Sequence, residues 1–537
     1  MTTTDLRKRK LATDDKPATG NRRKGSSGSG NGVTGGRGPS GLKLSFLCLV
    51  VSVVLLLFVF GVYHLYKIKD KSEPDPSHQP ILTKPSTFHT VSMPYHHESL
   101  HVNVMPSKPK PIPEHLLHVD NEHDPTTVGI SENASPYLAR LATKLGYSKV
   151  QYAAIIDAGS TGSRVLAYKF NRSFLDNKLV LYEELFKERK PGLSSFADNP
   201  SEGAHSIKLL LDEARAFIPK EHWSSTPLVL KATAGLRLLP ASKAENLLNA
   251  VRDLFAKSEF SVDMDAVEIM DGTDEGIFSW FTVNFLLGRL SKTNQAAALD
   301  LGGGSTQVTF SPTDPDQVPV YDKFMHEVVT SSKKINVFTH SYLGLGLMAA
   351  RHAVFTHGYG KEDTIIESAC VNPIIANRTW TYGNVQYKVS GKGDAADIKS
   401  SSEQPVVDFE ACLELVKSKV MPLVKPKPFT LKQHTVAAFS YYFERAIESG
   451  LVDPLAGGET TVEAYRKKAQ EICAIPNDEQ PFMCFDLTFI STLLREGFGL
   501  NEGKKIKLYK KIDGHEISWA LGCAYNVLTS DEKFNNS

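Results

Sequence analysis

The sequence predicts an α/β protein with two lobes around one cleft, carried on a single transmembrane helix. Three observations lead to this prediction. First, a strand pattern that ends in Asp and a Gly-rich turn occurs twice, at 153–165 and 296–308. Second, residues 44–66 form an uncharged run, and third, a Pro-rich segment follows this run. The 537 residues are 41% hydrophobic with a formal net charge of +1. This composition excludes a wholly disordered or collagen-like chain, and the near-zero net charge does not indicate a nucleic-acid-binding protein.

The N-terminal part is expected to be a cytosolic tail followed by a membrane anchor. Residues 1–43 are basic and rich in Gly and Ser, a composition that buries too little apolar surface to fold. The uncharged residues 44–66 would span about 34 Å as a helix, enough to cross a bilayer. They are too long for a cleaved signal peptide, and a buried core helix would not stand between such flanks. Because Lys and Arg dominate before the run, the positive-inside rule predicts a single-pass type II protein.

Residues 67–148 are expected to form a Pro/His-rich stalk, because Pro blocks regular helix and favours extended spacing. The His residues raise the alternative of a metal site, but only His97 and His101 have i, i+4 spacing, which favours a solvated linker. The globular part begins near residue 149, in a compartment expected to be oxidising. Sequons on this side of the membrane could carry glycans: Asn133 in the stalk, and Asn171, Asn377 and Asn535 in the globular part.

The candidate site begins with the two matched turns. In each, an apolar strand ends in Asp157 or Asp300, followed by a Gly/Ser/Thr turn and a second strand. Gly lets the backbone turn tightly and bring its N–H groups against a ligand, and hydroxyl groups add donors. An Asp at each strand end suits a hard cation and its waters. One such turn would be an ordinary hairpin, but two copies predict a phosphate chain gripped from both sides with a metal between them.

Three further segments carry candidate residues. Residues 230–240 are a strand end that runs into a turn at Thr233, residues 269–280 are an acidic turn entering an apolar helix, and residues 517–525 are a late helix with small side chains. Taken alone, Glu275 would complement a helix N-terminus and Trp519 would pack in the core.

The repeated Asp-x-Gly hairpin resembles that of the actin, sugar-kinase and heat-shock-chaperone superfamily, in which two ribonuclease-H-like lobes close over a nucleotide. Together with the three further segments, in this order, the hairpins resemble the five apyrase motifs of the nucleoside tri- and diphosphohydrolase (E-type nucleotidase) family. Three stretches and the single span are similar to the Golgi guanosine/uridine diphosphatase branch: residues 190–196, 439–443 and 484–489. The resemblance implies a first lobe of residues 149–271 plus about 515–537, and a second of 272–514.

The resemblance also implies roles for single residues. Glu275 would be the general base for a water in line with the terminal phosphorus, and Thr233 and Ser305 would orient that water. Asp157 and Asp300 would hold Ca²⁺ or Mg²⁺ through bound waters. The residues implied to bind phosphate are Gly159, Ser160, Thr161, Gly162 and Ser163 in the first loop, and Gly302, Gly303, Gly304, Ser305, Thr306 and Gln307 in the second.

Other side chains have two interpretations. Gln307 and Trp519 would lie in the outer shell of the metal, and Arg164 would neutralise phosphate charge or form a structural ion pair. Aromatic residues would stack on the nucleobase or belong to the core: Tyr441, Tyr442 and Phe443. The five Cys residues after the apolar run do not fix a disulfide pattern. The resemblance implies the pairs Cys370–Cys412 and Cys473–Cys484, with Cys523 left over.

The implied function is that of a luminal Golgi nucleoside diphosphatase, which converts UDP or GDP to the monophosphate by direct attack of water. Such hydrolysis would support glycosyltransferases, which release these diphosphates, and nucleotide-sugar transport; cleavage of the stalk would release a secreted form. The alternatives are a broader triphosphatase (apyrase), an exopolyphosphatase-like phosphatase and a glycoprotein that only binds nucleotide. A sugar kinase is disfavoured, because the catalytic part would lie across the membrane from cytosolic ATP.

Overall fold

The computed structural model describes Gly146 and residues 148–173, 178–330, 333–392, 404–454 and 457–535. The expected tail, the anchor at 44–66, nearly all of the stalk and the sequon at Asn133 lie outside these residues. Within the described part, no helix is both long enough and apolar enough to span a membrane.

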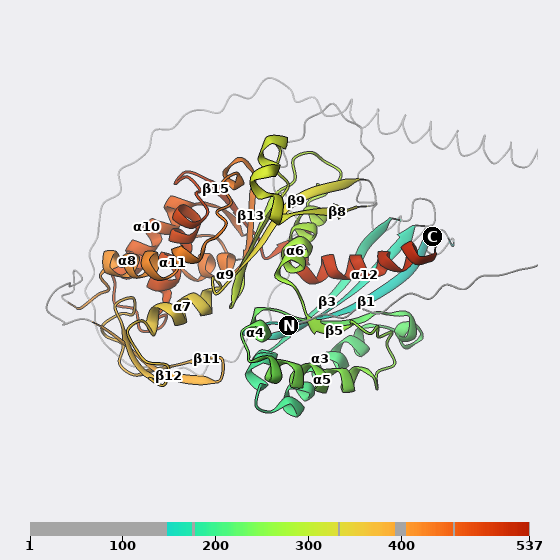
Figure 1. The fold of residues 1–537 in the computed structure, drawn as a ribbon, viewed down its shortest axis with the longest axis horizontal. Coiled ribbons are helices and arrows are strands. Elements are labelled where there is room, and N and C mark those ends of the chain that lie inside the picture. The colour runs from blue at the N-terminus through green and yellow to red at the C-terminus, as the bar shows by residue number, and fades with distance from the viewer. Residues whose placement is uncertain are drawn as a thin grey trace, which may run out of the picture. The chain divides into compact units, whose positions relative to one another are not determined.

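The first lobe is built on a five-stranded sheet with the order β3-β2-β1-β4-β5 (Figure 1). β1, β2 and β3 are antiparallel neighbours, whereas β4 and β5 run parallel to β1. β1 is central and buried from Ala153 to Ala158, which explains its continuous apolar sequence. Helices α3 and α5 bury their apolar faces on one side of this sheet. The elements are β1 (Ser148–Ala158), β2 (Ser163–Ser173), β3 (Leu179–Arg189), β4 (Leu228–Ala232), β5 (Val267–Ile269), α3 (Pro200–Phe217), α4 (Ala234–Arg237), α5 (Ala241–Phe255), and the 3₁₀ helices η2 (Leu193–Phe196) and η3 (Lys220–Ser225).

The second lobe repeats this arrangement. Its seven-stranded sheet has the order β14-β15-β13-β6-β7-β9-β8. β6, β7 and β9 are antiparallel neighbours, whereas β13 and β15 run parallel to the central β6. Without the two edge strands, the order and directions match those of the first sheet. The predicted two-lobed α/β fold is therefore confirmed. The strands are β6 (Ala297–Leu301), β7 (Ser305–Phe310), β8 (Met325–Val329), β9 (Lys334–Leu343), β13 (Val436–Ser440), β14 (Gly458–Thr461) and β15 (Lys505–Leu508).

Helices α6 (Gly272–Leu286) and α12 (Trp519–Asn535) lie between the two sheets (Figure 1). The Asp271 side chain caps α6 by accepting a hydrogen bond from Thr273 N at 2.7 Å. The two helices share a core with residues of both sheets, among them Ile155 of β1 and Ala298 of β6. Because α6 is packed on several sides, its sequence is apolar almost all round after the first turn.

The remaining elements complete the second lobe. Helices α7–α11 share the largest buried core with the strands of the second sheet. The disulfides Cys370–Cys412 and Cys473–Cys484 are present, as the family resemblance implies, and Cys523 is a buried free thiol. The bounds are α7 (Leu347–Phe355), α8 (Phe409–Lys419), α9 (Tyr441–Glu448), α10 (Val462–Cys473), α11 (Met483–Thr492), the helical turn η7 (Leu493–Gly497), the 3₁₀ helices η4 (Pro315–Phe324), η5 (Met421–Leu423) and η6 (Leu431–Gln433), and the strands β10 (Ile365–Ser368), β11 (Arg378–Tyr382), β12 (Val385–Gly391), β16 (Lys511–Ile512) and β17 (His515–Glu516).

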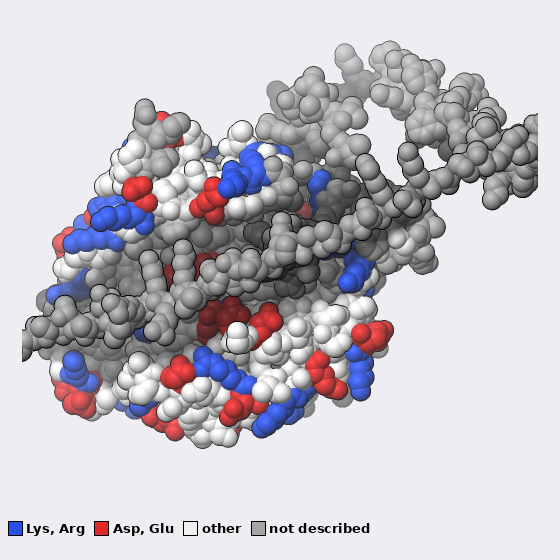
Figure 2. Space-filling view, turned by 45° about the vertical axis from the view of Figure 1, so that its right-hand side comes forward, with Lys and Arg blue, Asp and Glu red and all other residues white. Residues whose placement is uncertain are grey.

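The sequons differ in their accessibility. Asn377 is exposed, whereas Asn171 is buried within β2, with 7% of its surface exposed. The folded protein therefore exposes the Asn377 side chain and not that of Asn171. On the face in Figure 2, acidic and basic side chains alternate over most of the described surface, and a group of acidic side chains lies in a central hollow.

Candidate active site

The two Asp-headed turns meet in one cleft. Residues 159–162 connect β1 to β2, and residues 302–304 connect β6 to β7. The loops approach so closely that a Cβ atom on Gly303 would lie 2.4 Å from Ser160 Oγ. Gly346 supports the second loop from behind, since a Cβ atom there would lie 2.4 Å from the Gly303 backbone. Glycine is required at Gly346 because a side chain there would collide with backbone, whereas at Gly303 a side chain would displace those of Ser160 and Thr161.

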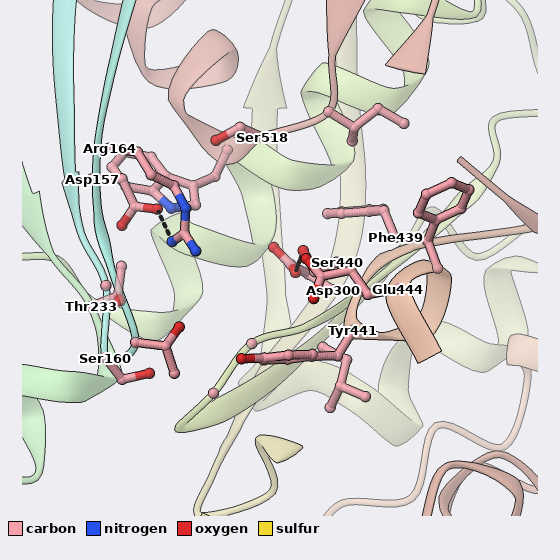
Figure 3. A pocket seen from close by; sticks show the side chains of 18 of the residues that line it. Asp157, Ser160, Arg164, Thr233, Asp300, Phe439, Ser440, Tyr441, Glu444 and Ser518 are labelled. Atoms are coloured by element: carbon pink, nitrogen blue, oxygen red, sulfur yellow. Dashed lines mark hydrogen bonds and ion pairs between the residues drawn. The ribbon is translucent and has the colours of Figure 1, made fainter. Parts of the chain in front are cut away.

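A pocket of about 290 Å³ lies between the loops (Figure 3). Asp157 and Arg164 point into it from the first lobe, and Asp300 and Tyr441 from the second. Its lining carries six carboxylates and three cations: Asp157, Glu188, Glu275, Asp300, Glu444 and Glu516 against Arg164, Lys190 and Lys510. Such a surplus of negative charge disfavours a polyanionic ligand unless a cation accompanies it.

One carboxylate oxygen of Asp157 is paired and the other is not. Arg164 Nη1 lies 3.4 Å from Asp157 Oδ2, and Arg164 Nη2 lies 2.8 Å from Glu188 Oε1. Arg164 was expected either to form a structural ion pair or to neutralise phosphate charge. The structure shows the ion pair, and Arg164 also lines the pocket. Asp157 Oδ1 is buried and has no hydrogen-bond partner among the described residues. Burial raises the pKa of Asp157 to about 6, although the charge of Arg164 opposes this shift.

Asp300 is held by two hydroxyl groups. Ser440 Oγ donates to Asp300 Oδ1 at 2.7 Å, and Ser279 Oγ donates to Asp300 Oδ2 at 3.3 Å. Burial raises the pKa of this carboxyl, and the two hydrogen bonds act in the opposite direction. Asp157 and Asp300 are close enough for each charged form to disfavour the other, because Asp300 contributes to the raised pKa of Asp157.

Glu275 reaches the same pocket from the first turn of α6. It is buried and forms an ion pair with Arg237, the last residue of α4. Burial raises the pKa of Glu275 to about 8; Arg237 opposes the rise, and the carboxylates of Asp300 and Asp157 add to it. A bound cation beside the two Asp residues would offset their charge and so lower the pKa of Glu275. Glu275 would then be ionised near neutral pH, as a general base must be.

Thr233 and Ser305 also line the pocket. Thr233 is the residue immediately before α4, and Ser305 opens β7. Gln307 Nε2 donates to Ser305 Oγ and to Ser341 Oγ, both at 2.9 Å. Gln307 therefore fixes the Ser305 hydroxyl and does not itself face the cavity. Trp519 lines the pocket where α12 begins.

The structure places only part of each predicted phosphate loop against the cavity. Gly159, Ser160, Thr161, Gly302, Gly303, Gly304 and Ser305 line it. The inner residues are not in its lining: Gly162, Ser163, Thr306 and Gln307. Ser163 Oγ accepts from Leu193 N at 3.1 Å, and Thr306 Oγ1 donates to the Asp300 backbone oxygen at 2.7 Å. These side chains stabilise the loops because they bond to neighbouring backbone instead of pointing outward.

The three aromatic residues at 441–443 do not lie together in the pocket. Tyr441 and Phe443 line it, whereas Tyr442 is fully buried in the core of the second lobe. Tyr442 cannot stack on a base because α9 turns its ring away from the cavity. The guanidinium of Arg445 lies 5.6 Å from the centre of the Tyr441 ring and supports it.

The donor set fits a divalent cation bound through waters. The described residues contain no cluster of three or more His, Cys, Asp or Glu side chains arranged to hold a metal directly. Asp157 and Asp300 both line the pocket, and Asp157 Oδ1 has no hydrogen-bond partner among the described residues. Oxygen ligands that contact an ion partly through its waters are typical of Mg²⁺ and of Ca²⁺.

Sequence reasoning missed three side chains that hold the candidate residues: Arg237, Ser279 and Ser440. Arg237 follows Thr233 within the same segment, and Ser440 directly precedes the predicted aromatic stretch. Their proximity to candidate residues along the chain was the signal that could have pointed to them.

Residues 144–536 match the GDA1/CD39 (nucleoside phosphatase) family. The chain belongs to this family. Ectonucleoside triphosphate diphosphohydrolase 5 of Bos taurus is 41% identical over 395 residues, which cover 71% of this chain and 88% of that protein. Nucleoside diphosphate phosphatase ENTPD5 of Homo sapiens is 40% identical over 392 residues, with the same coverage. A solved nucleoside triphosphate hydrolase from Neospora caninum covers 74% of this chain and 96% of its own, at 15% identity and a TM-score of 0.48.

The GDA1/CD39 match confirms the predicted family and the predicted class of enzyme, a hydrolase. It extends over both Asp-headed turns, over Glu275 on α6 and over α12. The whole pocket thus lies within the part of the chain that defines a GDA1/CD39 protein.

Proposed function

We propose that this GDA1/CD39 protein hydrolyses the terminal phosphate of UDP and GDP, giving the monophosphate and inorganic phosphate. The observation that carries the proposal is the convergence of Asp157, Asp300 and Glu275 on one pocket between two glycine loops. A curated relative at 40% identity is named a nucleoside diphosphate phosphatase.

The loops bind the phosphates and Glu275 activates the water. Backbone N–H groups of the cavity-facing loop residues hold the terminal phosphate from both lobes. Glu275, when ionised, takes a proton from a water in line with the phosphorus, and Thr233 and Ser305 orient that water by hydrogen bonds. Arg237 keeps the carboxylate of Glu275 in place through its ion pair. Water attacks the terminal phosphorus directly, and the P–O bond to the nucleoside monophosphate, the leaving group, breaks. No phosphoenzyme forms.

Asp157 and Asp300 would hold Ca²⁺ or Mg²⁺ through bound waters. The ion would supply positive charge that stabilises the phosphate oxygens as the terminal phosphoryl group is transferred. Tyr441 and Phe443 are two of the aromatic residues in the lining, and of the predicted stretch at 441–443 they are the ones placed to contact the nucleobase.

The compartment is proposed from the sequence. The uncharged run at 44–66, with its basic N-terminal flank, supports a single-pass type II topology with the catalytic part in the lumen. The resemblance to the Golgi diphosphatase branch supports the Golgi membrane as its location. The two disulfides are in keeping with an oxidising lumen. Protease protection of the globular part in sealed Golgi vesicles is the expected result, and digestion without detergent would contradict this topology.

A substrate panel tests the reaction. The purified protein with Mg²⁺ or Ca²⁺ is expected to release phosphate from UDP and GDP faster than from ATP, and to lose this activity with a chelator. Glu275→Gln should lower kcat by about 10²–10⁴-fold, the usual contribution of a general base. Preference for ATP would favour the broader triphosphatase, in line with the name of the bovine relative. Release from polyphosphate alone would favour the exopolyphosphatase alternative.

A further inference from the structure

Ser440 has a backbone conformation that residues with a side chain rarely adopt. It ends β13 and directly precedes α9, so the chain turns from strand to helix within one residue. Its φ and ψ angles are 56° and −132°. Among the described residues, Asn377 and Asp513 are the other non-glycine residues with positive φ, and both are exposed Asn or Asp residues, for which this is common.

The turn aims the Ser440 hydroxyl at one carboxylate of the site. β13 lies beside β6, with Phe439 opposite Asp300 and Ser440 opposite Leu301. From there Ser440 Oγ donates to Asp300 Oδ1 at 2.7 Å (Figure 3). The other oxygen of Asp300 accepts a longer hydrogen bond, of 3.3 Å, from Ser279. Ser440 is thus the closest hydroxyl that fixes the orientation of the Asp300 carboxylate.

A glycine would adopt this conformation without strain, yet it would lack the hydroxyl. Strained residues that persist at a site point to a role for their position. We propose that Ser440 is a positioning residue for Asp300, and that its strained turn is retained because it aims the hydroxyl at Oδ1. The proposal rests on the proposed function, in which Asp300 helps to hold the divalent cation.

Two substitutions separate strain from hydrogen bonding. Ser440→Ala removes the hydroxyl and keeps a Cβ atom at positive φ, whereas Ser440→Gly removes the hydroxyl and relieves the strain. Asp513→Gly is the matched control, because it replaces another positive-φ residue away from Asp300. Mn²⁺ binding to the full-length protein is followed by electron paramagnetic resonance with the α,β-imido analogue of UDP present, and thermal unfolding is measured without metal.

Both Ser440 variants are expected to need about 10–100-fold more Mn²⁺ for half saturation, the usual effect of losing a hydrogen bond to a metal-holding side chain. Ser440→Gly should unfold about 1–4 °C above Ser440→Ala in the absence of metal. Asp513→Gly should bind Mn²⁺ as the wild type does. A purely structural serine would instead change the unfolding temperature and leave Mn²⁺ affinity unchanged.

Wild-type Mn²⁺ affinity in either Ser440 variant would overturn the proposal, and so would a Ser440→Gly protein that unfolds below Ser440→Ala. Glu275→Gln distinguishes this failure from failure of the proposed function, since it should bind Mn²⁺ normally and release little phosphate. If the wild type releases no phosphate from any nucleotide, the proposed function fails, while the Mn²⁺ titrations still decide the role of Ser440.

Discussion

Replacing Arg237 by Met tests whether its ion pair sets the protonation of the proposed base. The side chains of Arg237 and Glu275 are only 16% and 9% exposed, so the substitution leaves a buried carboxyl without its cation. Burial, together with the carboxylates of Asp300 and Asp157, raises the pKa of Glu275 to about 8, and Arg237 opposes this rise. Removal of Arg237 should therefore raise the pKa of Glu275 further.

The size of the effect follows from the missing charge. An opposite charge within about 4–6 Å lowers a carboxyl pKa by about 1–3. The acid limb of kcat/KM in Arg237→Met should therefore move to higher pH by about one pH unit or more. Because the reaction needs ionised Glu275, activity at pH 7 should fall about 10-fold or more and recover at high pH. Arg237→Lys keeps the charge and should have an acid limb between the two.

The assay is phosphate release from UDP at saturating Mg²⁺, measured over a range of pH. Arg378→Met is the matched control, since its ion pair with Asp478 is 41% and 74% exposed and should contribute little. An acid limb at the wild-type pH in Arg237→Met, with activity lowered equally at every pH, would show that Arg237 does not set the protonation of Glu275.

Three further results are expected. Burial raises the pKa values of Asp157 and Glu275 from 3.8 and 4.5 to about 6 and about 8. The folded state therefore binds these protons more tightly than the unfolded state, so the metal-free protein should lose thermal stability as pH rises from about 4 to about 8. Added Mg²⁺ should raise the unfolding temperature more at pH 8 than at pH 5. An equal rise at both pH values would contradict this. Tyr441→Ala should raise KM for UDP about 5–100-fold through loss of stacking, whereas Tyr442→Phe, in the core, should leave KM unchanged; equal effects would argue against the assignment. Gly346→Ala should lower kcat about 10-fold or more, because the new methyl group displaces the second loop, whereas Gly503→Ala, with no atom within 4 Å, should keep wild-type kinetics.

The two lobes could be predicted because their signal is local. A buried strand that ends in Asp and a glycine turn is contained within about a dozen residues, and its recurrence indicates a repeated hairpin. Both hairpins are found, as β1–β2 and β6–β7. The pairing of β13 with β6 could not be read in the same way, because parallel strands far apart in the chain leave no mark on their own sequences.

The contacts that support the site could not be predicted from local sequence either. Arg237 lies 38 residues from Glu275, and Ser440 lies 140 residues from Asp300, so the fold alone brings each pair together. Local pattern also does not tell which side of a tight turn faces a cavity. The resemblance implied that Thr306 belongs to the phosphate site, whereas its hydroxyl donates to the Asp300 backbone oxygen. Likewise, Tyr442 is one residue from Tyr441 but lies on the buried face of α9.

The most direct measurement is a crystal structure of Glu275→Gln with UDP and Mn²⁺. We expect the terminal phosphate between residues 159–162 and 302–304, and the ion connected through waters to Asp157 and Asp300. The amide that replaces the Glu275 carboxylate should lie beside the water that faces the phosphorus. A diphosphate bound elsewhere, or an ion that contacts neither aspartate, would contradict the account.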